Sequence, residues 1–242
     1  MAIFPKPTPL PGGLALFEQL RRDPDVMALV TKADEAVATL GFTDHGRRHV
    51  NLVAVTAARV LSTLGHDEGQ CDLAAVAGLL HDIGNVEGRD GHAAAGAQMS
   101  YRLLRDRGVA PDPAAIVRDA IANHDEVEGG SPVNLPSAAL IVADKADIHR
   151  SRVRTRDRGE FDIHDRVNFA VVKSRLRVHS GERRIELMLA VDDSVASGDE
   201  VTELFGLRFA MSGYAANFLG CSYAVDINGR SSLQGGGTAL GE

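Results

Sequence analysis

A histidine and an aspartate stand side by side within an apolar run, in the segment LLHDIGN at positions 79–85. Leu79, Leu80 and Ile83 are residues of a protein core, and they are expected to carry His81 and Asp82 into the interior with them. Burial of an imidazole and a carboxylate is costly unless each has a partner. A bound cation is one such partner, and its other ligands must then come from elsewhere in the chain.

Up to about residue 160 the apolar residues recur with the period of an α-helix. Asp23 and Pro24 have the pattern of an N-cap followed by a first-turn proline, and the helix that they begin is expected to end near Gly41. A second helix has an apolar stripe at spacings of three and four residues. The stripe consists of Val50, Val53, Ala54, Ala57, Val60, Leu61 and Leu64. These patterns predict a lead over residues 1–22 and a helical domain over residues 23–160.

The periodicity changes in the last third of the chain. Within residues 175–191 apolar and polar residues alternate on both sides of a Ser-Gly-Glu turn, which predicts a β-hairpin with one buried face. A helix is expected over residues 200–219, followed by a third strand that ends before Asn228 and Gly229. We therefore predict a mainly α protein with a small α+β subdomain, of ββαβ order, over residues 161–230. A disordered tail is expected over residues 231–242.

Charge and cysteine content limit the partners of the chain. The formal net charge is −7 and the pI is near 5.7, which argues against a nucleic acid duplex or an anionic membrane and favours a small substrate. Cys71 and Cys221 lack the spacing of a thiolate zinc site or a disulfide framework. Neither a signal pattern nor an apolar run long enough to span a bilayer is visible, so a cytoplasmic location is expected.

Four further residues of metal-binding type stand in or beside the predicted helices, namely His49, His92, His124 and Asp144. Hydrogen bonds to the backbone would explain one buried His-Asp pair, but they do not explain six such residues in apolar segments. Imidazole and carboxylate ligands suit Fe, Mn, Co, Ni or Zn better than calcium or magnesium. Because this set exceeds what one tetrahedral zinc needs, we expect two divalent transition metals that share one carboxylate.

The order of these residues resembles that of a known family. His49, then His81-Asp82 and then Asp144 are similar to the signature of the HD superfamily of metal-dependent phosphohydrolases, and LLHDIGN resembles its central motif. The resemblance covers roughly residues 40–158. It implies a helical fold in which these four residues bind one metal.

The remaining two histidines resemble the extra ligands of the dinuclear branch of this superfamily. That branch, HD-GYP-like or HDIG, includes cyclic-dinucleotide phosphodiesterases and myo-inositol oxygenase. By this resemblance His92 and His124 bind a second metal and Asp82 bridges the two. The Gly-Tyr-Pro element of the HD-GYP proteins is absent, which argues against cyclic di-GMP as the substrate. Asn85 stands where a lysine often follows the central motif, which argues against a mechanism that needs that cation.

The expected reaction is hydrolysis of a phosphate ester. Two cations that share Asp82 would lower the pKa of a bridging water and hold the phosphoryl oxygens. Lys145, which follows the last proposed ligand, is expected to act as a catalytic and substrate-binding residue, with a surface charge as the alternative. Arg89 and Arg152 are further candidates for substrate binding. Asp125 is expected either to accept a proton from a metal-bound histidine or to act as a base.

The substrate is expected to be a small phosphomonoester or phosphodiester, nucleotides included. The same ligands also suit a diiron oxygenase of the myo-inositol oxygenase type, and a non-catalytic ligand-sensing module is a third alternative. The C-terminal subdomain is expected to cover the metal cleft, to extend the substrate pocket or to pair with a second subunit in a homodimer. His45 is predicted to support a ligand, and His164-Asp165 to be structural.

Overall fold

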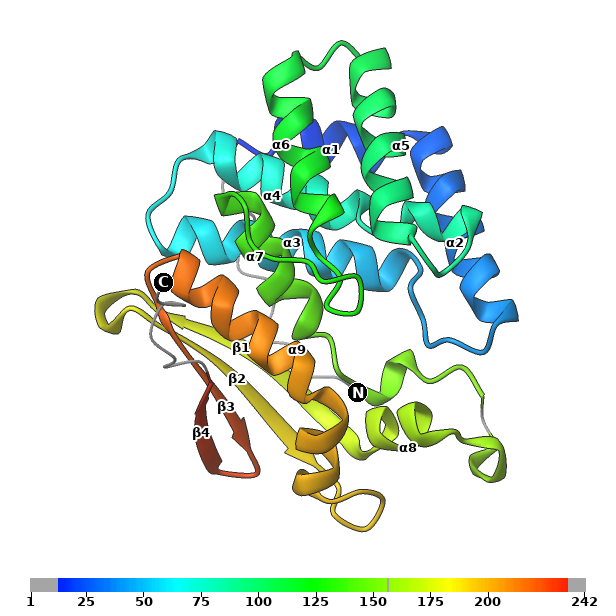
Figure 1. The fold of residues 1–242 in the computed structure, drawn as a ribbon, viewed down its shortest axis with the longest axis vertical. Helices are drawn as coiled ribbons and strands as arrows, with labels where there is room; N and C mark the ends of the chain where they lie inside the picture. Colours follow the sequence, from blue (N-terminus) through cyan, green and yellow to red (C-terminus); the bar gives the residue numbers. More distant parts are fainter. Residues whose placement is uncertain (1–12, 156, 235–242) are drawn as a thin grey trace.

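The structure consists of a helical half and a smaller half built on a β-sheet (Figure 1). The computed structural model describes residues 13–155 and 157–234; residues 1–12 of the predicted lead and 235–242 of the predicted tail lie outside the described residues. The helical half contains α1 (Ala15–Leu20), α2 (Pro24–Thr39), α3 (Arg47–Thr63), α4 (Glu68–Leu80), η1 (Ile83–Glu87), α5 (His92–Asp106), α6 (Pro111–Ala122), α7 (Leu135–Lys145) and η2 (Arg150–Arg152). The smaller half contains η3 (Arg158–Glu160), α8 (Ile163–Ala170), β1 (Val171–His179), η4 (Ser180–Glu182), β2 (Arg184–Val191), α9 (Gly198–Phe218), β3 (Ser222–Ile227) and β4 (Arg230–Gln234).

Helix α2 begins where the sequence predicts a helix start. The Asp23 side chain accepts hydrogen bonds from two backbone N–H groups of the first turn. Pro24 lacks the N–H that a residue at this position would leave unpaired. The helix ends at Thr39, shortly before Gly41, whose φ of 83° suits glycine and reverses the chain.

Helices α3 and α4 approach each other closely at Gly78. A Cβ atom at this position would lie 2.6 Å from the Cα atom of Ala54. Only glycine therefore allows the two helix backbones to pack at this distance. The close packing brings His49, on α3, next to His81, which follows the last residue of α4.

Helix α7 runs through the middle of the molecule and contacts α3, α4, α6 and α9. Leu140, Ile141 and Val142, three consecutive residues, are all fully buried. A helix that is apolar on every side has no face for solvent, and its polar end at Asp144 and Lys145 is therefore drawn into the interior. It has only 11 residues, and no helix in the described part of the chain is long and apolar enough to cross a membrane.

The sheet has four strands in the order β1-β2-β3-β4. Strands β1 and β2 form the predicted antiparallel hairpin, in which Leu176 pairs with Leu187. Strand β3 runs parallel to β2 because α9 crosses over between them, and β4 is antiparallel to β3. Helix α9 lies between the sheet and α7 (Figure 1). The sheet thus places α9 against the helical half.

Two elements of the smaller half differ from the prediction. Helix α8 precedes the hairpin, where Asp162 caps a short helix, so the order is αββαββ and not ββαβ. Strand β4 occupies positions predicted as the start of a disordered tail. Asn228 and Gly229 have φ angles of 52° and 81°, which form a tight hairpin turn, and they return the chain along β3. The polar segment RSSLQ lacks apolar alternation because it is an edge strand.

Candidate metal centre

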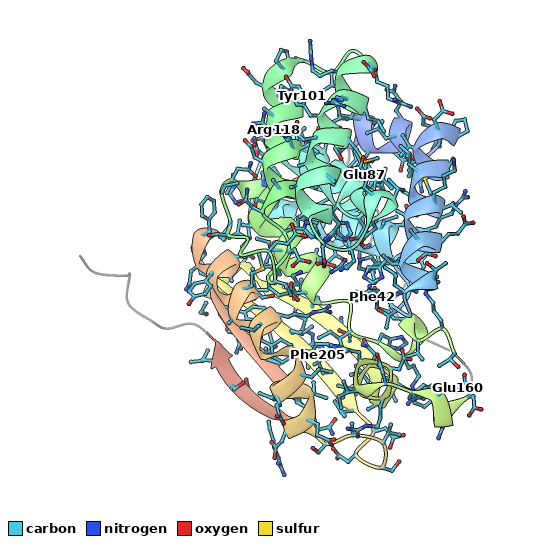
Figure 2. All side chains as sticks on the ribbon, turned by 45° about the vertical axis from the view of Figure 1, so that its right-hand side comes forward. Phe42, Glu87, Tyr101, Arg118, Glu160 and Phe205 are labelled. Atoms are coloured by element: carbon cyan, nitrogen blue, oxygen red, sulfur yellow. The ribbon has the colours of Figure 1, made fainter. Side chains whose placement is uncertain are left out.

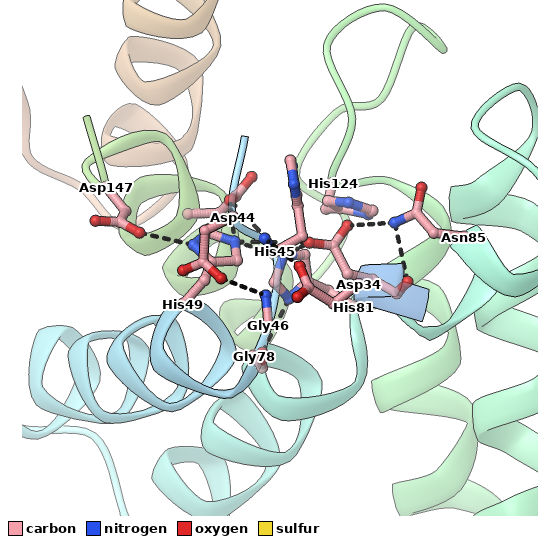
Figure 3. A network of polar contacts seen from close by, with 12 residues as sticks. Asp34, Asp44, His45, Gly46, His49, Gly78, His81, Asn85, His124 and Asp147 are labelled. Carbon is pink, nitrogen blue, oxygen red and sulfur yellow. Dashed lines mark hydrogen bonds and ion pairs between the residues drawn. The ribbon is translucent and has the colours of Figure 1, made fainter. Parts of the chain in front are cut away.

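Four buried histidines point one ring nitrogen each toward a common centre, and Figure 3 labels three of them. His49 lies on α3, His81 follows α4, His92 begins α5 and His124 lies just after α6. None is more than 2% exposed. The Nε2 atoms of His49 and His81 are 3.3 Å apart, and those of His92 and His124 are also 3.3 Å apart. The four segments therefore supply two adjoining pairs of potential ligand atoms.

The other ring nitrogen of each histidine is bound to an oxygen atom. An oxygen acceptor requires the hydrogen to be on Nδ1, which leaves the lone pair of Nε2 for a metal ion. The four imidazoles are thus oriented as ligands by the fold itself. The acceptors are Asp147 Oδ2 for His49 at 2.8 Å, the Gly78 carbonyl for His81 at 2.9 Å, the Arg89 carbonyl for His92 at 3.0 Å and the Ile121 carbonyl for His124 at 2.7 Å.

Protonation differs between these histidines. Burial lowers the pKa of His124, and the neighbouring His81 and Lys145 lower it further, so this imidazole is neutral. Burial also acts to lower the pKa of His81, but the Asp82 and Asp144 carboxylates outweigh it and raise this pKa. A cation bound to His81 would therefore displace a proton.

Asp82 points its two carboxylate oxygens in different directions. Oδ2 lies 3.1 Å from His81 Nε2 and 3.6 Å from His49 Nε2. Oδ1 lies 3.7 Å from His92 Nε2 and accepts a hydrogen bond of 3.0 Å from the Asn85 amide. Burial acts to raise the pKa of Asp82, but the surrounding histidines hold it well below its usual range. Each oxygen thus belongs to a different pair of histidines.

Asp144 supplies the last proposed ligand from the end of α7. Its Oδ1 lies 3.3 Å from His49 Nε2 and 3.7 Å from His81 Nε2. Its Oδ2 is 2.9 Å from the Lys145 ammonium. Burial opposes ionisation, yet Lys145, His49 and His81 lower the pKa of Asp144 well below its usual range. The lysine thus binds one oxygen of Asp144, and the other points to the histidines.

The arrangement fits divalent cations. Apart from its ion pairs with His81 and His49, the buried Asp82 Oδ2 has no hydrogen-bond partner among the described residues, and a bound cation would offset the cost of its burial. Three groups of residues each have ligand atoms that lie within 4.8 Å of one another. Together the groups include all six residues predicted as metal ligands. Imidazole nitrogen and carboxylate oxygen together suit a transition metal. The groups are His49, His81 and Asp82; His81, His124 and Asp144; and Asp82, His92 and His124.

Lys145 is buried beside this cluster, and its ammonium is paired with two carboxylates. It forms ion pairs with Asp144 and with Glu126. Burial acts to lower the pKa of Lys145, but the two carboxylates raise it, so the side chain is charged. This placement differs from that of a substrate-binding residue, because the side chain is 4% exposed and its charge is paired with the two carboxylates.

Asp125 is held as an ionised acceptor. Its Oδ1 accepts hydrogen bonds from the backbone of Val127 and Glu128, and its Oδ2 lies 3.0 Å from an Arg89 nitrogen. Burial acts to raise the pKa of Asp125, but Lys145 and other nearby cationic groups lower it. The imidazole of His92 instead has its Nδ1 against the Arg89 carbonyl, with Glu128 Oε1 also 2.9 Å away.

The two arginines predicted to bind substrate occupy different environments. Arg89 is 24% exposed, lines a cavity and lies with one nitrogen 3.3 Å from His92 Nε2. Arg152 is 3% exposed, and it donates to the carbonyls of Asp44 and Asp147. Its place differs from the prediction, because these contacts keep its guanidinium out of the cavity lining.

A cavity of about 490 Å³ adjoins the metal ligands and lies between the two halves of the molecule. His92, Asp125 and Arg89 contribute from the helical half, together with His45, which binds the Thr43 carbonyl through Nδ1. Helices α8 and α9 form the opposite wall. Their contribution consists of Asp162, His164, Asp165, Asn168, Leu204, Phe205, Leu207 and Arg208. The smaller half thus forms part of the pocket, one of the three alternatives predicted for it, and His164-Asp165 lies on its wall.

Sequence reasoning missed several residues that support the site. Asp147 orients His49 and is almost fully buried; burial opposes its ionisation, but His49 and Arg152 lower its pKa. Glu126, which was not among the predicted site residues, has a side chain that is 12% exposed and binds Lys145. Asp147 follows Asp144 by three residues, and this spacing was the signal in the sequence that could have identified Asp147. Nothing in the local sequence around Arg208 indicated its contact with Glu126.

The chain is similar to several known proteins. Residues 47–150 match the model of the HD domain family. An uncharacterized protein of Methanocaldococcus jannaschii is 26% identical over 203 residues, which cover 74% of this chain and 76% of that protein. A predicted HD superfamily hydrolase from an uncultured Thermotogales bacterium, known from a crystal structure, is 28% identical with a TM-score of 0.43; the match covers 55% of this chain and 74% of that one.

The HD domain match extends from the start of α3 to the start of η2. It contains all six proposed ligands, from His49 to Asp144. The predicted fold class, a mainly helical HD-type domain followed by a small α+β part, is confirmed. Helices α8 and α9, which form one wall of the cavity, lie outside the match.

Proposed function

We propose that this protein is a metal-dependent phosphohydrolase with a dinuclear centre. The observation that carries the proposal is the division of the Asp82 carboxylate between two pairs of histidines. A carboxylate in this position is suited to bridge two cations. The match to the HD domain supports the proposal, because the ligand order resembles the signature of metal-dependent phosphohydrolases.

The six proposed ligands would divide between two cations, with Asp82 available to both. His49, His81 and Asp144, whose ligand atoms lie within 3.7 Å of one another, would hold the first. His92 and His124 would hold the second. Bound at these positions, two divalent transition metals supply an acidified water and polarise a phosphoryl oxygen.

The residues of the chain provide the surroundings of that chemistry. Arg89 lines the cavity beside His92, so its guanidinium is available to a phosphoryl oxygen. Its partner Asp125 remains ionised and fixes the orientation of the guanidinium. Asn85 donates to Asp82 Oδ1 and thereby holds the carboxylate in place. We therefore propose a small phosphomonoester or phosphodiester as the substrate.

Metal analysis combined with two chromogenic esters tests this function. Purified protein should contain about two Fe, Mn, Co or Ni per chain, and it should release nitrophenol from p-nitrophenyl phosphate or bis-p-nitrophenyl phosphate. Removal of the metal by a chelator should abolish release, and its return should restore it. A diiron centre with a mixed-valence signal that consumes O₂ and cleaves neither ester would identify the oxygenase instead.

A further inference from the structure

A continuous row of charged side chains joins the metal centre to helix α9. Asp144 binds Lys145, Lys145 binds Glu126, and Glu126 Oε1 accepts a hydrogen bond of 3.0 Å from Arg208 Nε. The first three residues belong to the helical half, whereas Arg208 lies on α9. This arginine is therefore a contribution of the smaller half to the surroundings of the metals.

Arg208 is only partly neutralised by its contacts. Its carboxylate partner, Glu126, also binds Lys145, so one negative charge serves two cations. The carboxylate that binds Lys145 on its other side, Asp144, is itself a proposed metal ligand. If Asp144 binds a metal ion, Glu126 alone faces both Lys145 and Arg208, and the guanidinium of Arg208 keeps part of its positive charge for an anion.

The guanidinium of Arg208 is placed where a ligand can reach it. The side chain is 27% exposed and lines the same cavity as Arg89 and His92. The guanidinium carbon of Arg208 lies 5.2 Å from the centre of the Phe205 ring, and this contact restricts the orientation of the guanidinium. Arg208 uses Nε for its ion pair with Glu126, and within residues 13–155 and 157–234 no hydrogen bond or ion pair is seen at its two terminal nitrogens, which can therefore donate to an anion.

Arg89 has a matching arrangement on the helical half. It binds Asp125, the neighbour of Glu126 in the sequence, and its guanidinium carbon lies 5.6 Å from the centre of the Phe42 ring. Figure 2 labels Phe205 on α9 and Phe42 at the boundary of the two halves. Two arginines, each held by a carboxylate and a phenylalanine, thus face one cavity from the two halves of the molecule.

We propose that Arg208 binds the phosphoryl group of the substrate together with Arg89, an inference that rests on the function proposed above. The guanidinium offers two parallel N–H donors to a phosphate, and a lysine does not reproduce this geometry. Because α9 lies outside the segment that matches the HD domain, the smaller half completes the anion-binding site. Arg208 is therefore a substrate-binding residue, in addition to its tie to Glu126.

The inference is tested with inorganic phosphate as the probe and the metal-loaded full chain as the protein. Isothermal titration gives the Kd for the wild type and for Arg208→Gln, Arg208→Lys and Arg177→Gln. Metal content and melting temperature are measured on the same samples. Arg177 is a matched control, because it is exposed on β1 of the same half and is absent from the cavity lining.

We expect Arg208→Gln to raise the Kd for phosphate about 10-fold or more, with unchanged metal content. Arg208→Lys should raise it less, and Arg177→Gln should leave it at the wild-type value. An unchanged Kd in Arg208→Gln would show that Arg208 only ties α9 to Glu126. If that variant melts much earlier, Arg208→Lys decides, since it retains the charge that faces Glu126 and a wild-type Kd in it would overturn the inference. Failure of the wild type to bind phosphate would instead refute the proposed function, and the inference with it.

Discussion

At the scale of single residues, the candidate metal centre depends on ring nitrogens and carboxylate oxygens that the fold has already oriented. His49 and His124 are held through Nδ1 before any cation arrives, and Asp82 is held by Asn85. Such preorganisation lowers the entropic cost of binding a ligand. Individual substitutions should therefore affect metal content in a position-specific way.

Asp82 and His124 should differ in their effects on metal content. Asp82→Ala removes a ligand from both pairs of histidines, so we expect the loss of both metals and of all activity. His124→Ala removes a ligand from the second pair, so about one metal per chain should remain. Plasma mass spectrometry of the two purified variants measures this difference. Equal metal content in Asp82→Ala and the wild type would refute the bridging role of Asp82.

Gly84 should tolerate no side chain. A Cβ atom at Gly84 would lie 2.1 Å from the backbone oxygen of His92 and 2.4 Å from the backbone nitrogen of Gly96. Gly84→Ala must therefore push η1 away from α5, which separates Asp82 from His92. We expect a loss of about 2 kcal/mol or more in the free energy of unfolding, together with reduced metal content.

Gly206, in the middle of α9, is the matched control for Gly84. A Cβ atom there meets nothing within 4 Å, and its φ angle is not positive. Gly206→Ala should stabilise the protein by about 0.5–1 kcal/mol, because alanine loses less conformational entropy in a helix. Denaturation in urea compares both variants with the wild type. Equal effects of the two substitutions would show that the close approach at Gly84 is unimportant.

At the scale of elements, helix ends determine where the charged groups of the helical half lie. Asp23 caps α2 and also forms an ion pair of 2.6 Å with Arg107, which follows α5. This pair joins the start of one helix to the end of another. The hydrogen bond from Arg107 is the main cause that lowers the pKa of Asp23.

The depressed pKa predicts a pH-dependent contribution of Asp23 to stability. A carboxylate whose pKa is lower in the folded state stabilises the protein above its unfolded value, here 3.8, and loses this effect as the pH falls through the folded value. Asp23→Asn retains a capping oxygen but removes the charge. We expect it to be less stable by about 0.5 kcal/mol at pH 7, and we expect the difference to disappear as the pH falls through the folded pKa of Asp23. Urea denaturation at several pH values measures this difference, and a constant difference would assign the effect to capping alone.

The elements differ in how far their own sequences predict them. The stripe on α3 and the alternation in β1 and β2 are local patterns, and both elements form as predicted. Helix α8 and strand β4 were not predicted, because each is short and polar and is fixed by contacts with neighbours in space. Propensity and pattern carry little information about such elements.

At the scale of the whole molecule, the cavity belongs to both halves. The six proposed ligands could be predicted from the sequence because they lie at helix ends in a recognisable order, from His49 to Asp144, and the structure brings them together. The opposite wall of the cavity was not predicted from the sequence. The packing of α9 against α7 depends on the whole sheet, and no pattern in the sequence around Arg208 indicates it. Residues at contacts between distant elements are therefore the part of a site that sequence analysis misses.

The wide separation of the ligands along the chain has a further consequence for folding. His49 and Asp144 are far apart in sequence, and a cation that binds both closes a long loop, as a cross-link does. Because an unfolded chain cannot present these ligands together, metal binding and unfolding are thermodynamically linked. Free metal at 1,000 times its Kd would add about 4 kcal/mol to the free energy of unfolding.

Chelation should therefore lower the melting temperature of the wild type, and added metal should restore it. Asp82→Ala should melt at the same temperature with and without chelator, which separates the loss of metal from other effects of the reagent. Differential scanning calorimetry measures both. If the melting temperature of the metal-containing wild type does not change with chelator, the ligands keep their positions without bound metal. A lower melting temperature after chelation would show that bound cations hold the segments of the helical half together around the candidate metal centre.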